Sequence, residues 1–308
     1  MPSELFSKRL LVVTGKGGVG KSTVSAALAL AAAARGKRVL VCEVAARERL
    51  PALLGGEPAG PEISEAAPGV FSVHVLPPDA MREYALMVLR YKAIYKAVFE
   101  NRLVRYFLRA VPSLAEIVML GKVWWHAARD ERFDLVILDA PATGHAVSLL
   151  ATPANMLQIV SDGPLARDMR EMQALLTDPA RTSVCLVALP EEMPVNEAIE
   201  LDAQLGGTLA LPRGPVFLNA FNETRFTPGE LAALEGGGAR LAAAAAVARE
   251  YEDRADICLH AEDKLRVELR RQPLRLPMLY AQDFGPRQVQ LIARVLAEGL
   301  AASEGIAS

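Results

Sequence analysis

The chain has 308 residues, 52% of them hydrophobic, with a formal net charge of −2 and a mean hydropathy of +0.21. These totals exclude a disordered chain, argue against bulk nucleic-acid binding, and allow one large α/β domain. Its three cysteines are isolated in the sequence, which argues against a disulfide scaffold or a zinc site. With no secretory signal and no apolar run of spanning length, we expect a cytoplasmic protein without stable membrane insertion.

The first predicted unit is a strand, a helix and a second strand. Residues 9–14 are mainly apolar, residues 21–35 have strong helix propensity and stop at Gly36, and Val39–Cys42 is a second apolar run. Short connections on both sides of a helix favour parallel strands. We therefore expect an α/β fold with a doubly wound, mostly parallel sheet.

Between the first strand and the first helix lies a glycine-rich segment of the form G-x-x-x-x-G-K-[ST]. In a strand–loop–helix setting this pattern predicts a phosphate-binding loop, because glycines allow close approach and the helix N-terminus attracts anions. Lys21 is expected on the β- and γ-phosphates of a nucleotide, and the Ser22 hydroxyl on Mg²⁺. The expected nucleotide-binding residues here are Gly15, Lys16, Gly17, Gly18, Val19, Gly20, Lys21, Ser22 and Thr23.

The next part of the chain changes from strand to helix. Residues 51–69 are expected to form a loop with a short helix, and Val70–Leu76 a strand. Residues 79–130 have no strand signal, and apolar residues recur there at helical spacing on both sides of a break at Pro112. We interpret them as a helical insertion. Its amphipathic face either packs internally or forms a client groove, a dimer surface or a membrane-surface contact.

The most apolar strand of the chain, Phe133–Asp139, ends in an acid. An Asp at the carboxyl end of a central strand lies beside the phosphate loop, where it can hold Mg²⁺ through water. The alternative is an acid that only ends a strand. We expect Asp139 and Ser22 to be the magnesium residues.

The rest of the chain continues the α/β pattern. Strands are expected at Ser183–Leu189 and Pro215–Asn219, with a helix from Val195 between them. Residues 234–256 and 260–271 are predicted helices, Arg275–Met278 a short strand or loop, and 285–301 the closing helix. The sequence has no internal repeat, so we expect residues 1–308 to form a single domain with one phosphate loop.

Several motifs together resemble a known family. The nonamer at 15–23, with its early Lys16, is similar to the deviant Walker A loop of MinD, ParA and ArsA ATPases. Residues 139–145, Asp-Ala-Pro-Ala-Thr-Gly-His, resemble the D-T-A-P-T-G-H switch II of ArsA-type ATPases. Residues 177–197 and Leu218-Asn219 also resemble segments of that family. The chain is most similar to the short bacterial branch of these anion-transporting P-loop ATPases, which also include arsenite-pump and tail-anchored-protein guided-entry members.

The resemblance implies an ATPase that uses ATP and Mg²⁺. It also implies a nucleotide-gated dimer, either a homodimer or a heterodimer with a paralogous ATPase, in which Lys16 reaches the partner's nucleotide. Lys16 is otherwise a solvated loop charge. The resemblance implies that Lys16, Lys21 and Asp139 are the catalytic residues and that residues 79–130 couple the reaction to a protein client.

For the base, the resemblance implies that Asn219 reads adenine and that Pro277 and Met278 close over it.

One departure from the family concerns hydrolysis. Relatives have a water-orienting Asp after the second strand, and the aligned residue here is Ala45, with Glu43 a weak substitute. Because positioning of water dominates phosphoryl-transfer catalysis, hydrolysis is expected to be slow in this chain alone. The alternative is a nucleotide-binding regulatory subunit paired with an active paralogue. A MinD/ParA-like positioning ATPase is disfavoured, because the tail Ala297–Ser308 is rich in small residues and not basic.

Overall fold

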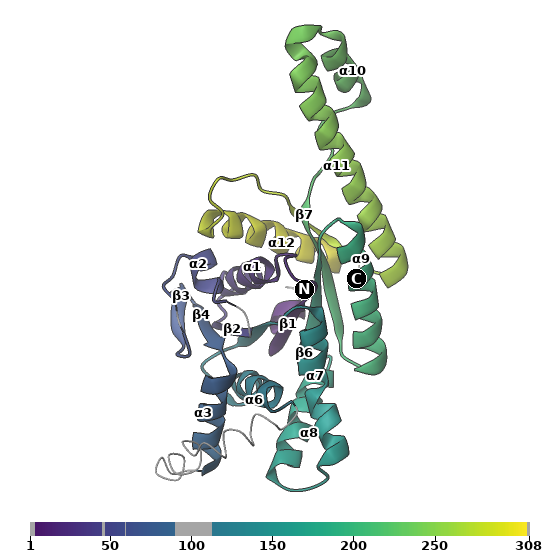
Figure 1. Cartoon of the computed structure of the whole chain (residues 1–308). Helices are drawn as coiled ribbons and strands as arrows, with labels where there is room; N and C mark the ends of the chain where they lie inside the picture. The colour runs from purple at the N-terminus through teal and green to yellow at the C-terminus, as the bar shows by residue number, and fades with distance from the viewer. Residues whose placement is uncertain (1–3, 45–46, 59, 90–112, 307–308) are drawn as a thin grey trace.

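The computed structural model describes residues 4–44, 47–58, 60–89 and 113–306. Eight strands form one sheet in the order β3-β4-β2-β5-β1-β6-β7-β8, and every neighbouring pair except β3 and β4 is parallel. The predicted doubly wound, mostly parallel α/β fold is therefore confirmed (Figure 1). The strands are β1 (Leu10–Thr14), β2 (Val39–Val44), β3 (Ser64–Ala67), β4 (Val70–Val75), β5 (Leu135–Asp139), β6 (Thr182–Ala188), β7 (Arg213–Phe221) and β8 (Leu274–Pro277).

Helices cover both faces of this sheet. The helical elements are η1 (Glu4–Ser7), α1 (Lys21–Ala33), α2 (Leu50–Leu54), α3 (Pro77–Leu89), α6 (Leu114–Arg129), α7 (Thr143–Ile159), α8 (Pro164–Thr177), α9 (Glu192–Ala203), η2 (Gln204–Thr208), α10 (Pro228–Gly236), α11 (Ala239–Leu269) and α12 (Pro286–Ile306). Helices α1, α2 and α12 pack on one face, and α6, α7, α8 and α9 on the other (Figure 1).

The central strands are buried on both faces, which explains their continuous apolar runs. In β1, Leu10 and Val12 belong to the core under α6 and α7, whereas Leu11 and Val13 belong to the core under α1 and α12. This alternation follows from the two-residue period of a strand. β1 lies between β5 and β6, so the loop after β1 emerges beside the end of β5. In a doubly wound sheet, the carboxyl ends of the central strands form the ligand edge.

The segment 79–130 is described only in part, because residues 90–112 lie outside the described residues. Its described helices are α3 and α6. Ile117, Leu120 and Val123 of α6 are almost fully buried, in the same core as β5 and α7. The last helix of the segment therefore packs directly on the sheet.

Two predictions of local structure were wrong in detail. Residues 64–67 were predicted as loop but form β3, the antiparallel edge strand; Ser-Glu-Ala-Ala has no strand-like alternation, and only the pairing with β4 makes it a strand. The two predicted helices 234–256 and 260–271 are one helix, α11, preceded by the separate helix α10. No proline or glycine interrupts α11, whereas Gly237 and Gly238 separate it from α10.

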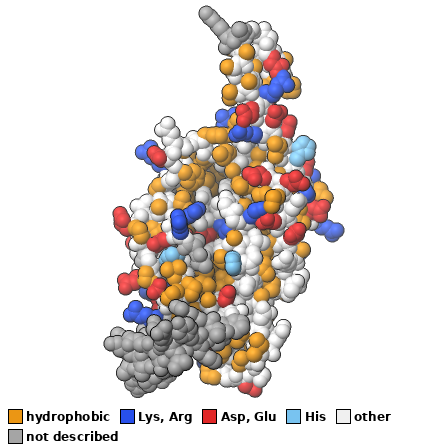
Figure 2. Space-filling model, in the orientation of Figure 1, with side chains coloured by type: hydrophobic (Ala, Val, Ile, Leu, Met, Phe, Trp, Pro, Cys, Tyr) orange, Lys and Arg blue, Asp and Glu red, His pale blue; other side chains and the backbone are white. Residues whose placement is uncertain are grey.

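Helix α10 and the first part of α11 form a hairpin that projects from the body (Figure 1). None of the residues of α10 is buried, and its start is fixed by a capping box between Thr227 and Glu230. Exposed apolar side chains on α11 include Val247 and Ile257. Figure 2 shows hydrophobic and charged side chains intermixed along this projection.

Candidate functional site

The loop between β1 and α1 is shaped by close approaches that only glycine permits. A Cβ on Gly15 would lie 2.2 Å from the Val187 carbonyl oxygen, and a Cβ on Gly20 would lie 2.3 Å from Asn219 Nδ2. Gly20 also has φ +92° and directly precedes Lys21, the first residue of α1. The loop therefore rests against β6 and β7, and its end leads into a helix N-terminus that favours anions.

The remaining loop residues divide between core and surface. Val19 is buried in the core under α1, whereas Gly17 and Gly18 are exposed. Gly18, Lys21, Ser22 and Thr23 line a cleft of about 860 Å³ at the carboxyl edge of the sheet. With Gly20, five of the nine predicted residues 15–23 thus line the cleft.

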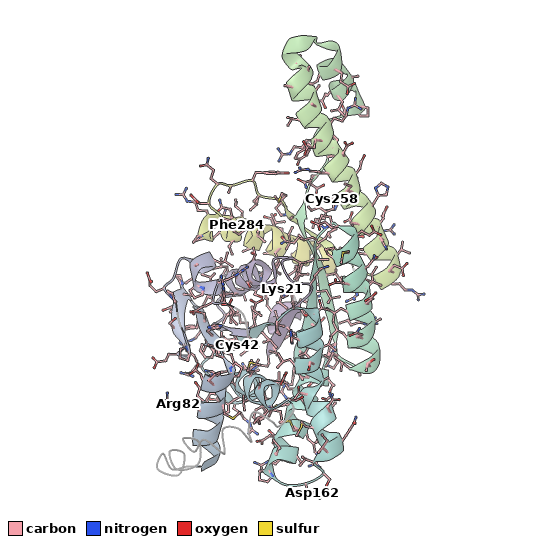
Figure 3. The ribbon with its side chains drawn as sticks, in the orientation of Figure 1. Lys21, Cys42, Arg82, Asp162, Cys258 and Phe284 are labelled. Atoms are coloured by element: carbon pink, nitrogen blue, oxygen red, sulfur yellow. The ribbon has the colours of Figure 1, made fainter. Side chains whose placement is uncertain are left out.

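Lys21 folds back over the loop. Its ammonium donates a hydrogen bond to the Lys16 carbonyl oxygen at 2.9 Å. Burial lowers the pKa of the Lys21 side chain, and the nearby negative charge of Asp139 partly opposes this shift. Figure 3 shows Lys21 at the start of α1, in the middle of the molecule. A half-buried cation among backbone N–H groups is suited to bind phosphate oxygens.

Asp139 ends β5 and is held by two serines of α1. Its carboxylate accepts hydrogen bonds from Ser22 Oγ at 2.6 Å and from Ser25 Oγ at 3.0 Å. Burial raises the pKa of the Asp139 carboxyl, and the two serine hydrogen bonds lower it in part. Sequence reasoning missed Ser25, although it lies three residues after Ser22 and therefore on the same helix face.

Lys16 has a partner within its own chain. Its ammonium lies 2.7 Å from Glu197 Oε1 of α9, and both side chains are about one-third exposed, at 28% and 34%. The pair joins the phosphate loop to the start of α9. The sequence contained both residues among its family-like segments but gave no sign that they touch.

Asn219 of β7 also holds the loop. Its amide nitrogen donates a hydrogen bond to the Val19 carbonyl oxygen at 2.9 Å. Pro277 is the last residue of the neighbouring strand β8, and the backbone N–H of Met278 donates to the Phe221 carbonyl oxygen at the end of β7. Met278 is 38% exposed. The structure thus places Asn219 and Pro277 on two adjacent strands, with Met278 directly after the second of them.

The segment after β2 also lines the cleft, through residues between 47 and 53. Ala45, the residue aligned with the water-orienting Asp, lies outside the described residues. Glu43 is 1% exposed, and its carboxylate accepts hydrogen bonds from the backbone N–H groups of Arg49 and Leu50. Both carboxylate oxygens of Glu43 are therefore engaged by the chain itself.

Several cleft residues were not predicted from the sequence. Arg47, Glu48, Arg49, Ala52 and Leu53 come from the segment that includes α2, and Phe284 comes from the loop before α12. Figure 3 shows Phe284 on that loop. Leu53 and Phe284 lie more than 230 positions apart in the chain, and no local sequence motif marks any of these residues.

Two features are absent from the part of the chain that the structure describes. None of the helices there combines the length and apolar character needed to cross a bilayer. The described part of the chain also has no group of three or more His, Cys, Asp or Glu side chains placed to hold a metal ion. A phosphate-loop magnesium site needs no such group, because nucleotide oxygens and water complete its coordination.

The chain is similar in sequence to proteins of one family. The family model of anion-transporting ATPases (ArsA) matches residues 8–162. ATPase BagA of Mycobacterium tuberculosis is 32% identical over 247 residues, covering 76% of this chain and 72% of that protein. Arsenical pump-driving ATPases of Acidiphilium multivorum and Escherichia coli are 31% and 30% identical, and each alignment covers 69% of this chain and 35% of the pump protein.

Proposed function

We propose, from the premise that this chain belongs to the anion-transporting (ArsA) ATPase family, that it binds ATP with Mg²⁺ and hydrolyses it to ADP and phosphate as a nucleotide-gated dimer. The observation that carries the proposal is the arrangement at the carboxyl ends of β1 and β5. There the phosphate loop, Lys21 and the Ser22–Asp139 pair meet at one cleft. The named relatives are ATPases, which supports the reaction class.

Magnesium fits the residues present. Ser22 and Asp139 supply hard oxygen donors within 2.6 Å of each other, and hydroxyl and carboxylate oxygens are what Mg²⁺ binds. The Asp139 carboxylate is buried without a cationic hydrogen-bond partner among the described residues, so a cation there would offset its burial. When bound, Mg²⁺ would neutralise charge on the terminal phosphates.

The protein groups act mainly by positioning and by charge. Residues 15–23 would hold the phosphates on backbone N–H groups, and Lys21 would neutralise charge that develops on the γ-phosphate during in-line attack by water. Lys16 would add a second cation from the partner of a homodimer or of a heterodimer with a paralogue. For the partner's nucleotide to be reached, Lys16 must first leave Glu197.

The base and client roles remain parts of the same proposal. Asn219 would read adenine, with Pro277 and Met278 closing over the ring. We treat residues 1–308 as one ATPase domain that acts in the cytoplasm and couples to a protein client through residues 79–130. Helix α6 supports such coupling, because it packs on the same core as β5, which ends in Asp139.

A second candidate function is a nucleotide-binding regulatory subunit with little hydrolysis, paired with an active paralogue. The engagement of Glu43 favours it, because both carboxylate oxygens already accept backbone N–H groups and leave Glu43 poorly placed to orient water. A partner chain would then complete the reaction.

Phosphate release by the full chain with Mg²⁺ and ATP tests the proposal. Lys21→Ala should lower the rate by about 100-fold or more, as loss of a cation on the reacting group does. Lys16→Ala should abolish dimer formation with a non-hydrolysable ATP analogue, measured as mass in solution against the ADP state. Tight nucleotide binding without phosphate release, restored by a paralogue, would establish the regulatory subunit instead. Equal rates for all three proteins and no ATP-dependent dimer would refute the stand-alone ATPase, and absence of nucleotide binding would refute both candidates.

A further inference from the structure

The α2 side of the cleft, lined by residues between 47 and 53, carries a cation that has no role in the proposed ATPase reaction. Arg49 lines this side directly before α2, whereas Lys21 and Asp139 lie on the phosphate-loop side. Arg49 is exposed, and among the described residues its guanidinium has no hydrogen-bond or ion-pair partner. A free guanidinium at an anion-binding cleft suits phosphate, which it binds through two parallel N–H···O bonds.

The backbone of Arg49 is fixed more firmly than its exposure suggests. Its N–H group donates to both oxygens of the Glu43 carboxylate, at 2.9 and 3.0 Å, and the N–H of Leu50 donates to one of them at 3.2 Å. Hydrogen bonds to a charged acceptor are about twice as strong as neutral ones. Glu43 therefore holds the start of α2, and with it the Cα of Arg49, against the end of β2.

The Glu43 carboxylate, which holds the backbone of Arg49, lies on the strand next to the one that carries Asp139. Glu43 of β2 pairs in register with Asp139 of β5. Burial raises the pKa of the Asp139 carboxyl, and the positive charge of Arg49 is one of the groups that partly oppose this rise. Arg47 lines the same side of the cleft, but in the described part of the chain no hydrogen bond holds its backbone.

We propose that Arg49 binds the γ-phosphate of ATP from the α2 side of the cleft, and that Glu43 is the positioning residue that holds Arg49 there. The inference rests on the proposed function. The phosphate loop encloses the β-phosphate, so the oxygens left for the α2 side are those of the terminal phosphate. Arg49 thus distinguishes ATP from ADP.

Equilibrium binding of ADP and of a non-hydrolysable ATP analogue, each with Mg²⁺ and the full chain, tests the Arg49 role. Arg49→Ala should weaken binding of the analogue about tenfold or more and binding of ADP less than about twofold, since one charge-assisted contact is lost. Arg49→Lys should be intermediate, because it keeps the charge without the planar fork. Arg167→Ala removes an exposed arginine of α8 and should change neither affinity.

The positioning role of Glu43 is tested by the ratio of the affinity for the ATP analogue to the affinity for ADP. Glu43→Ala should lower the preference for the analogue as Arg49→Ala does, and the double variant should be no worse than Arg49→Ala alone. Glu43→Gln keeps one acceptor oxygen and should restore most of the preference. A lower melting temperature with an unchanged ratio of affinities would make Glu43 merely structural and overturn its positioning role.

Lys21→Ala separates failure of this inference from failure of the proposed function. Lys21→Ala should weaken binding of both nucleotides. If it does and Arg49→Ala leaves the ratio of affinities unchanged, the Arg49 role is refuted and the ATPase proposal stands. If Lys21→Ala leaves both affinities unchanged, the nucleotide site itself is refuted.

Discussion

The nucleotide cleft and the projecting α10–α11 hairpin are opposite extremes of this molecule. At the cleft, side chains of α1, β2, β5 and β7 hydrogen-bond to one another or to the backbone, and the phosphate loop lies in close contact with β6 and β7. In the hairpin, α10 has no buried residue and Val247 of α11 is 67% exposed. The comparison indicates that substitutions should be costly where several elements meet and nearly free where one helix meets solvent.

Gly15→Ala should give the largest effect, since it forces a Cβ to within 2.2 Å of the Val187 carbonyl oxygen. Its φ of +152° adds strain for any residue with a side chain. We expect a loss of about 2–4 kcal/mol in the free energy of unfolding, measured with urea, together with loss of nucleotide binding.

Gly229→Ala in α10 is the matched control, because a Cβ there meets nothing within 4 Å and its φ is not positive. It should change stability by less than about 1 kcal/mol. Equal losses for the two variants would break the contrast between cleft and hairpin.

Asp139→Asn should remove function while stabilising the ligand-free fold. Burial raises the pKa of the Asp139 carboxyl in the folded protein. The contribution of this group to folding stability is therefore greatest below its unfolded-state pKa of about 3.9, and it is lost as the pH rises through its folded-state pKa. Asn does not ionise and escapes this loss. Without Mg²⁺ and nucleotide, the melting temperature of the variant should exceed that of the wild type at neutral pH, and the difference should shrink in acid.

Phosphate release by Asp139→Asn should fall by about 100-fold, since the carboxylate can no longer hold Mg²⁺. A wild type that is the more stable protein at neutral pH would contradict the burial argument. Retained hydrolysis would contradict the magnesium role.

Glu197→Gln should act on assembly and hardly on folding. The Lys16–Glu197 pair is about one-third exposed, and such pairs contribute about 0.2–1 kcal/mol. Releasing Lys16 should therefore raise the ATP-analogue-dependent dimer fraction, with an association constant about 1.4- to 5-fold higher, measured by light scattering at low salt.

Glu200→Gln removes an exposed charge from the same helix, α9, and is the control for net charge. High salt should erase the difference between the two variants. A weaker dimer for Glu197→Gln would indicate that the ion pair supports the dimer-competent form of the loop.

Val247→Ser should give the smallest effect. With the side chain 67% exposed on the hairpin, the free energy of unfolding should change by less than about 0.5 kcal/mol, and phosphate release should be unchanged. Leu265→Ala, on the fully buried root of the same helix, should cost about 2–5 kcal/mol. Similar losses at both positions would show that the tip of α11 is packed against something in solution.

The sequence predicted the parts of the site that depend on local pattern. The glycines and Lys21 are recognisable because a phosphate loop needs fixed spacing, and Asp139 because it ends the most apolar strand. The sheet followed from apolar runs and short connections. All of these signals extend over fewer than about ten residues.

The rest depends on contacts between distant residues. Ser25 meets Asp139 across 114 positions, and Asn219 meets Val19 across 200. The contact of Lys16 with Glu197 and the hydrogen bonds of the Arg49 N–H to Glu43 cannot be predicted from hydrophobic periodicity. Likewise, the alanine run 242–246 predicts a helix but not that this helix leaves the body, because alanine suits both buried and exposed helix faces.

The three glycines at 236–238, at the end of α10 and in the turn into α11, offer one attachment point for a reporter. A Cβ on Gly236 meets nothing within 4 Å, so a fluorophore attached through a side chain at this position should disturb no packing. The 31-residue α11 spans about 46 Å, and a tilt of about 5° at its root displaces its far end by about 4 Å. Its root packs on α9, the helix that carries Glu197, so a dye at this turn converts rearrangements near the phosphate loop into an optical signal.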